Sequence, residues 1–322
     1  MSTLFLQSIA DRFWLNLWVV QSWCEIFWVK EEKKIVALFE KNREIINARP
    51  LVKWVGGKRQ LIKQFHELFP KPNEYKNYYE PFLGGGAVFF SLQKKKSYLS
   101  DVNEELINMY QVVKNSPEEL ISFLKTLSYT KECYEEIRAW DRTKNWLKKH
   151  SNIERAGRFI FLNRTCFNGL HRVNSRGEFN VPMGNYKNPD FVQEKNIRNT
   201  STLLIKTEAE IKIESFEHVA KKAKSGDFVY LDPPYDTLTE TANFTSYNKD
   251  DFGREMQRKL ADVFRVLDKK GCKVMLSNHN TPFIRELYKG FRFEIVSARR
   301  NINSKSDGRG GMEEIVVLNY RN

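Results

Sequence analysis

Cysteine is scarce in this chain, with four in 322 residues, at positions 24, 133, 166 and 272. They form no CxxC pair and no Cys/His pattern with the spacing of a zinc site. Neither a disulfide framework nor a metal centre is therefore expected. This cysteine usage fits a protein of the reducing cytoplasm, which is the location we expect.

A long uninterrupted apolar run is also missing. Residues 1–47 are rich in Trp and other apolar side chains, but polar and charged residues interrupt them, so no run approaches the ~20 residues of a membrane span. The segment lacks the basic start and cleavage site of a secretory signal. Trp14, Leu17 and Trp18 predict one face of a helix that packs on the protein or on a partner. A non-native start upstream of the true one is the open alternative, and we assign the segment no function.

Two common nucleotide-binding patterns are absent around the glycines at 84–86. No Lys-Ser/Thr pair follows these glycines, which excludes a P-loop. Their spacing also departs from GxGxxG, which argues against a site for a nicotinamide cofactor. What is present is Glu80–Ala87, which predicts a strand, a glycine turn and a helix, where a ligand can lie against bare backbone. Asp101, at the end of the next predicted strand, can accept both hydroxyls of a ribose. With Glu104 it also predicts a helix capping box.

Positive charge is in excess, because 53 Lys and Arg face 40 Asp and Glu, for a formal net charge of +13. Such a surplus favours a polyanionic partner, most simply nucleic acid, with a solvated basic face as the alternative. Aromatic residues make up 13% of the chain and leave rings that can stack on bases.

From residue 50 onward the pattern is α/β. The end of the chain alternates apolar and polar residues at 291–298 and 314–318, which predicts an antiparallel hairpin around a basic, glycine-rich loop. The simplest assembly is an α/β sheet that holds a mainly helical insertion. The other expected elements are strands at 77–80, 97–100, 203–205, 228–231 and 273–276, helices at 87–93 and throughout 104–162, and a structured loop with a hairpin at 167–188.

The tetrapeptide Asp232-Pro233-Pro234-Tyr235 follows the apolar run 228–231, which reads as a buried parallel strand. Ligands of open α/β sheets bind beyond the carboxyl ends of the strands. The prolines make the turn stiff. A carboxylate and a neighbouring carbonyl can hold an exocyclic NH2 group so that its lone pair faces an incoming methyl group, and a base can stack on the tyrosine. The alternative is a strand-ending turn with a helix-capping Asp.

Several blocks of the sequence, in this order, closely resemble the Dam-type DNA adenine-N6 methyltransferases. The resemblance spans about residues 50–320. It implies a Rossmann-like methyltransferase sheet with an antiparallel C-terminal hairpin and an inserted, mainly helical DNA-recognition domain. The matching blocks are Lys53–Lys58, Glu80–Ala87, Asp101, Asn168–Pro182 and Asp232–Tyr235, with further matches at Thr241–Tyr247 and Ser277-Asn278.

The resemblance implies that S-adenosylmethionine is the cofactor. Trp54 and Lys58 match residues that hold its methionine end, and Asp232 with Pro233 matches the pair that holds the target amino group. Tyr235 would then stack on a flipped adenine, and Pro234 completes the motif. The matching cofactor-binding residues are Trp54, Lys58, Phe82, Gly84, Gly86, Asp101, Phe216 and Asp232, although Phe216 can equally be a core aromatic.

The resemblance also implies a DNA-reading hairpin, with GATC as the family's usual target. An aromatic residue and a Leu can wedge between bases there, and an Arg and an Asn can pair with base edges. Asn185 stands where close relatives more often have Arg, so one DNA contact departs from the family pattern. The matching DNA-binding residues are Lys53, Phe167, Asn168, Leu170, Arg172, Asn174 and Tyr186.

These observations and the family resemblance predict a site-specific DNA adenine methyltransferase that acts on duplex DNA, without metal or membrane, with a cognate restriction endonuclease as a candidate partner. The expected domains are a Trp-rich extension at 1–47, a catalytic domain at 48–103 and 189–322, and a recognition insertion at 104–188. One alternative is a DNA-binding protein with an inactive methylase fold, which the intact Asp232 and glycine loop disfavour. Another is methylation of a different base, but Asp in place of Ser before Pro-Pro disfavours cytosine, and the reading-hairpin match disfavours RNA.

Overall fold

The computed structural model describes residues 45–236, 252–297 and 313–321. Three expected features lie outside these residues: most of the Trp-rich start (residues 1–44), the family block at Thr241–Tyr247, and the glycine-rich loop of the C-terminal hairpin. Residues 46–322 form one compact unit. No helix in the described ranges is long and apolar enough to cross a membrane.

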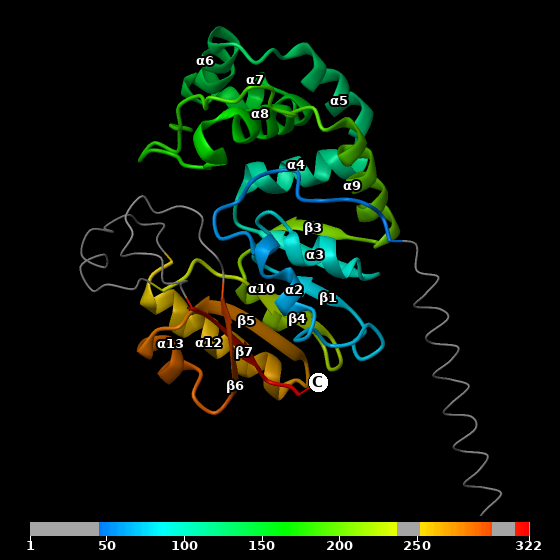
Figure 1. Ribbon diagram of the computed structural model, residues 1–322, viewed down its shortest axis with the longest axis vertical. Helices are drawn as coiled ribbons and strands as arrows, with labels where there is room; N and C mark the ends of the chain where they lie inside the picture. Colours follow the sequence, from blue (N-terminus) through cyan, green and yellow to red (C-terminus); the bar gives the residue numbers. More distant parts are fainter. Residues whose placement is uncertain (1–44, 237–251, 298–312, 322) are drawn as a thin grey trace, which may run out of the picture. The chain divides into compact units, whose positions relative to one another are not determined.

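A sheet of seven strands is at the centre of the described chain, in the order β3-β2-β1-β4-β5-β7-β6 (Figure 1). The pairs from β3 to β5 are parallel, whereas β7 pairs antiparallel with both β5 and β6. The predicted α/β fold and the predicted C-terminal hairpin are therefore confirmed. The strands are β1 (Tyr78–Glu80), β2 (Ser97–Asp101), β3 (Glu210–Ile213), β4 (Phe228–Leu231), β5 (Lys273–His279), β6 (Arg292–Ser297) and β7 (Glu313–Leu318).

Strand β4 shows how both faces of the sheet become buried. Phe228 and Tyr230 belong to one hydrophobic cluster, and Val229 and Leu231 belong to a second one. Since successive side chains of a strand point to opposite faces, the continuous apolar run gives two cores, as in other parallel sheets. One core includes residues of α10 (Glu217–Lys222), α12 (Arg254–Lys269) and α13 (Pro282–Leu287), and the other includes residues of α2 (Ile62–Phe65), α3 (Ala87–Leu92) and α4 (Glu104–Asn115).

The predicted helical region at 104–162 is confirmed but divided. It consists of α4, α5 (Pro117–Thr126), α6 (Lys131–Ala139), α7 (Trp146–Lys149) and α8 (Asn152–Thr165), with a short 3-10 helix, η2 (Trp140–Arg142), after α6. Helices α5 to α8 lie together (Figure 1). Beyond α8, η3 (Phe167–Gly169) leads into a loop in which Val173 bridges Phe179 in antiparallel fashion, so the expected hairpin is present in short form.

Two local predictions are wrong. The strand expected at 203–205 is the end of helix α9 (Glu194–Lys206), because Ile197, Thr200 and Leu204 recur at helical spacing and bury one face. The edge strand β3 begins only at Glu210.

The expected capping box of Asp101 and Glu104 is also absent. Helix α4 is capped by Asn103, whose side chain accepts a hydrogen bond from the backbone N–H of Leu106. Asp101 Oδ1 instead accepts from the Asn103 backbone N–H, at 3.0 Å.

Candidate active site

The carboxylate of Asp232 lies just beyond the carboxyl end of β4 and is bound from two neighbouring elements. Lys58 Nζ, at the start of the 3-10 helix η1 (Lys58–Gln60), is 2.8 Å from Asp232 Oδ1. Ser277 Oγ, on β5, donates a hydrogen bond to the same oxygen at 2.8 Å. Burial raises the pKa of Asp232 above its usual range, and the Lys58 charge and the hydrogen bond from Ser277 oppose that effect.

The ring of Tyr235 is surrounded by charged and aromatic groups. Lys58 Nζ lies 4.6 Å from the ring centroid, which is a cation–π distance. The His279 ring meets it edge-on at 4.9 Å between centroids. The Tyr235 hydroxyl donates to Glu314 Oε2 at 2.6 Å. Lys58 therefore contacts both the acid and the aromatic residue of the tetrapeptide.

The proline turn is braced from α12 and β5. Gln257 Nε2 donates to the Pro234 carbonyl at 2.8 Å, and Asn278 Nδ2 donates to Gln257 Oε1 at 3.1 Å. Asn278 Oδ1 accepts from the Asp236 backbone N–H at 2.9 Å. Since the Pro234 carbonyl is already bonded to protein, the Pro233 carbonyl is the better candidate for holding a substrate amine.

The glycine turn after β1 is shaped by Trp54. Gly84 has φ +47°, and a Cβ added there would lie 2.7 Å from Trp54 Cδ1, so the position requires glycine for both backbone and space. The Gly84 backbone N–H donates to Asp101 Oδ2 at 3.0 Å. Gly86, with φ +69°, precedes the first residue of α3. The structure therefore brings the predicted residues Trp54, Gly84 and Asp101 together.

These residues suit the chemistry of S-adenosylmethionine. The Asp101 carboxylate stands at the end of β2, where an acid can meet ribose hydroxyls, and burial raises its pKa. The turn of Gly84 offers backbone without side-chain bulk. Lys58 supplies a cation beside Asp232. Phe216 is buried and stacks on Phe82 at 5.4 Å between ring centroids, a position that suits a core aromatic as well as a cofactor-facing one.

Lys53 and Trp54 join the glycine turn to the segment after α8. The buried Asn163 donates from Nδ2 to the carbonyls of Lys53, at 2.8 Å, and Gly169, at 3.1 Å, and it accepts from the Lys53 N–H at 2.7 Å. The Trp54 ring stacks on His171 at 5.4 Å between centroids. Burial and the Arg158 charge lower the pKa of His171 to about 4, which keeps this imidazole neutral at neutral pH. The predicted cofactor and DNA-reading segments are thus in direct contact.

The predicted DNA-binding side chains differ in how far they are already bonded. Lys53 Nζ donates to the Tyr186 hydroxyl at 3.2 Å, and Arg172 Nε donates to Asn180 Oδ1 at 2.8 Å. Phe167 is 53% exposed, and Asn168 beside it has φ +54°. Asn174 holds the hairpin turn, because its Oδ1 accepts from the backbone N–H groups of residues 176 and 178, each at 3.0 Å.

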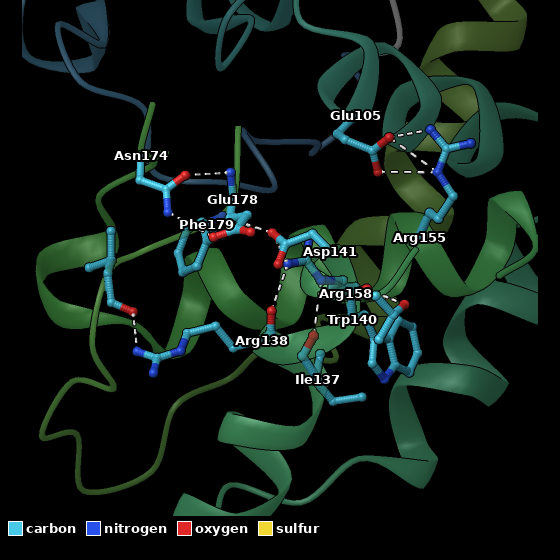
Figure 2. Close-up of polar contacts among 12 residues, drawn as sticks. Glu105, Ile137, Arg138, Trp140, Asp141, Arg155, Arg158, Asn174, Glu178 and Phe179 are labelled. Atoms are coloured by element: carbon cyan, nitrogen blue, oxygen red, sulfur yellow. Dashed lines mark hydrogen bonds and ion pairs between the residues drawn. The ribbon is translucent and has the colours of Figure 1, made fainter. Parts of the chain in front are cut away.

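A buried ion pair anchors the predicted DNA-reading hairpin to the helices (Figure 2). Arg158 Nη2, on α8, lies 2.6 Å from Asp141 Oδ2, and the Phe179 backbone N–H donates to the same oxygen at 2.7 Å. Arg158 Nε also donates to the Ile137 carbonyl at 3.0 Å. Breaking such a buried ion pair lowers the stability of the fold, so this contact holds the hairpin against the helices.

Sequence reasoning missed three supporting residues: Gln257, His279 and Glu314. Ser277 and Asn278 lie in a block of the family resemblance, but nothing local predicted their contacts with Asp232 and Asp236. The one available signal was their place at the carboxyl end of a predicted strand next to the Asp232 strand. Among the described residues, no group of three or more His, Cys, Asp or Glu could hold a metal ion.

Comparison with known proteins finds similar DNA methyltransferases. Residues 54–302 match the family model for the D12 class N6 adenine-specific DNA methyltransferases. The chain is 45% identical to the type II methyltransferase M1.LlaDCHI of Lactococcus lactis subsp. cremoris, over 88% of this chain and 99% of that protein. It is 44% identical to the type II methyltransferase M.MjaIII of Methanocaldococcus jannaschii, over 85% and 100%. It is 34% identical to the DNA adenine methylase of Escherichia coli K12, over 84% and 95%.

Proposed function

This chain belongs to the D12 class N6 adenine-specific DNA methyltransferases, which transfer a methyl group from S-adenosylmethionine to adenine in DNA, and we propose that it acts at GATC on an adenine turned out of the duplex. One observation carries the proposal. The partly buried Asp232 carboxylate and the Tyr235 ring share the end of β4, and Lys58 contacts both. An acid that holds an amine and a ring that stacks on its base are what N6 methylation requires.

We assign cofactor binding to residues around the glycine turn. Trp54, packed over Gly84, and Lys58 would hold the methionine end. Lys58 has three donors, of which one meets Asp232 and one the Gly56 carbonyl, so a third is left for the cofactor carboxylate. Asp101 would accept the ribose hydroxyls. When bound, the cofactor supplies an electrophilic methyl group. The full proposed set is Trp54, Lys58, Phe82, Gly84, Gly86, Asp101, Phe216 and Asp232.

Asp232 has two tasks in this proposal. Its carboxylate and the Pro233 carbonyl accept the two N6 hydrogens, which turns the lone pair of the nitrogen toward the methyl group. After transfer the nitrogen must lose one proton. Burial raises the pKa of Asp232 and so makes its carboxylate a better proton acceptor at that moment. No covalent intermediate is needed, so catalysis rests on positioning and electrostatics.

The hairpin after α8 is the proposed DNA reader. A base inside a duplex is unreachable, so the target must be extruded, at a cost of about a few kcal/mol. The exposed Phe167 and the nearby Leu170 are suited to fill the space that the base leaves. Arg172 is exposed and can pair with a base edge in the major groove. The other proposed DNA contacts are Lys53, Asn168, Asn174 and Tyr186.

A restriction endonuclease of the same specificity is a proposed partner. Two of the relatives carry the name type II methyltransferase, which supports that role. A sequence-specific DNA-binding protein without activity is a weaker candidate, because Asp232, its partners and the glycine turn are all in place.

The decisive experiment measures transfer of a labelled methyl group to duplexes that contain GATC or one of its single-base variants, followed by identification of the modified base. We expect N6-methyladenine in GATC and much less in any variant. Equal labelling of all duplexes would contradict the GATC assignment. Label found on cytosine, or none at all, would contradict the assigned reaction.

A further inference from the structure

Glu314 binds the aromatic residue of the tetrapeptide from a distant part of the chain. The Tyr235 hydroxyl donates to Glu314 Oε2 at 2.6 Å, although 79 positions separate the two residues. A short bond from a phenol to a carboxylate is charge-assisted, and such bonds are stronger than neutral ones. Glu314 is therefore a strong polar contact of the Tyr235 side chain, which the Asp232 carboxylate also approaches.

The antiparallel end of the sheet explains why Glu314 reaches this place. β5 runs parallel to β4, and β7 pairs antiparallel with β5 so that His279 faces Glu314. The first residues of β7 thus lie beside the carboxyl ends of β4 and β5. His279 and Glu314 approach Tyr235 together, one with its ring edge and the other with its carboxylate.

The neighbouring acid, Glu313, has a different environment. Successive residues of a strand point to opposite faces. Glu313 is exposed, and its Oε2 accepts from Asn280 Nδ2 at 2.9 Å. Two adjacent glutamates on one strand therefore differ in whether they contact the site, and Glu313 is a natural control for Glu314.

We propose that Glu314 is a positioning residue that fixes the plane of the Tyr235 ring for stacking on the target adenine. The inference rests on the proposed function, since it assumes that the flipped base stacks on Tyr235. Without the hydroxyl–carboxylate bond the Tyr235 ring can rotate about its side-chain torsions. A misplacement of about 1 Å in an active site can lower the rate ~100-fold. Lys58 also lies over the ring, but this cation–π contact restrains the orientation of the ring less than a hydrogen bond does.

The test compares Glu314→Ala, Glu314→Gln, Tyr235→Phe and the double variant Tyr235→Phe/Glu314→Ala, with Glu313→Ala as control. The first readout is the fluorescence of 2-aminopurine placed at the target adenine, because a ring that stacks on the flipped analogue quenches it. The second is the pair kcat and KM for DNA, and the third is the dissociation constant of S-adenosylhomocysteine.

We expect Glu314→Ala and Tyr235→Phe each to lower kcat about tenfold, with brighter 2-aminopurine and unchanged cofactor affinity. The double variant should be no worse than either single one, because both remove the same bond. Glu314→Gln keeps an acceptor and should recover most of the rate. Glu313→Ala should behave as wild type.

Two results would overturn the inference. If Glu314→Ala lowers the rate as much in the Tyr235→Phe background as in wild type, Glu314 acts only on the fold. If Tyr235→Phe keeps its rate within twofold of wild type, the bond does not position the ring, and this holds even if Glu314→Ala fails to fold. Failure of the proposed function looks different, because the wild-type protein itself would then transfer no methyl group to adenine.

Discussion

Lys58 Nζ and Asp232 Oδ1 lie 2.8 Å apart, and the two side chains are 4% and 19% exposed. This ion pair joins the segment expected to hold the cofactor to the turn expected to hold the substrate amine. A largely buried pair is sensitive to the loss of one partner, because the remaining charge is left without compensation. The two halves of the proposed reaction therefore share one electrostatic unit.

Asp232→Ala should abolish methyl transfer and leave cofactor binding largely intact, because the carboxylate acts mainly on the amine. It should also lower the free energy of unfolding by about 3 kcal/mol, since it leaves Lys58 buried without its counter-charge. Turnover, cofactor binding and denaturant unfolding measure the three effects. Ser277→Ala is the control, because it removes one hydrogen bond to Asp232 and keeps both charges. Activity of Asp232→Ala within tenfold of wild type, a loss below about 1.4 kcal/mol, would refute the assigned role.

Glu80, at the end of β1, should make the protein less stable as pH rises. Burial raises its pKa from 4.5 to about 8, with hydrogen bonds from the Tyr78 hydroxyl and the Phe89 backbone N–H acting in the opposite direction. Because the folded state holds this proton more tightly, the stabilisation is fully present below pH 4.5 and is lost as pH rises through about 8.

The comparison of wild type with Glu80→Gln isolates this effect. Between pH 4.5 and about 8 the stability of wild type relative to the variant should fall by at most about 1.4 kcal/mol per pH unit. Urea unfolding at several pH values measures the difference. If the stability difference does not change with pH, or if wild type gains stability relative to the variant as pH rises, Glu80 is ionised in the fold.

Local patterns in the sequence were sufficient for the parts of the site that are contiguous. The glycine turn and the tetrapeptide each follow a strand directly, so their position at the edge of the sheet follows from chain order. Glu314 could not be found this way, because its contact with Tyr235 depends on the register between β5 and β7. A local pattern does not fix such a register.

The wrong strand at 203–205 has a similar cause. Leu203, Leu204 and Ile205 form a short apolar run, which a helix or a strand can equally contain. In the structure Leu203 and Leu204 are buried and Ile205 is 57% exposed, which fits one face of α9. Helix packing decided what the three residues alone left open.

Arg172→Ala should relax sequence choice and leave general DNA affinity largely unchanged. Arg172 is exposed and is oriented by Asn180, so its guanidinium is available to a base edge. Loss of a base-reading contact costs about 1–3 kcal/mol of discrimination. The measurement is kcat/KM on GATC and on single-base variants. Arg176→Ala is the control on the same hairpin, since Arg176 is paired with Glu178 at 3.1 Å. If Arg172→Ala kept full preference for the cognate site, the reading assignment would be wrong.

Removing the N-terminal segment should leave specific activity on GATC duplexes close to that of the full chain, because every matching block begins at or after Lys53. We place the cut after residue 45, where the compact unit begins. Ile46 exchanges hydrogen bonds with the Gln93 side chain, and Arg49 exchanges two with Asn196. A chain that starts at residue 46 keeps both pairs, whereas one that starts at residue 50 loses them and should melt at least about 3 °C lower. Turnover and circular dichroism of both truncations test this. A folded chain from residue 46 that binds cofactor but no longer methylates would show that the removed segment belongs to the working enzyme.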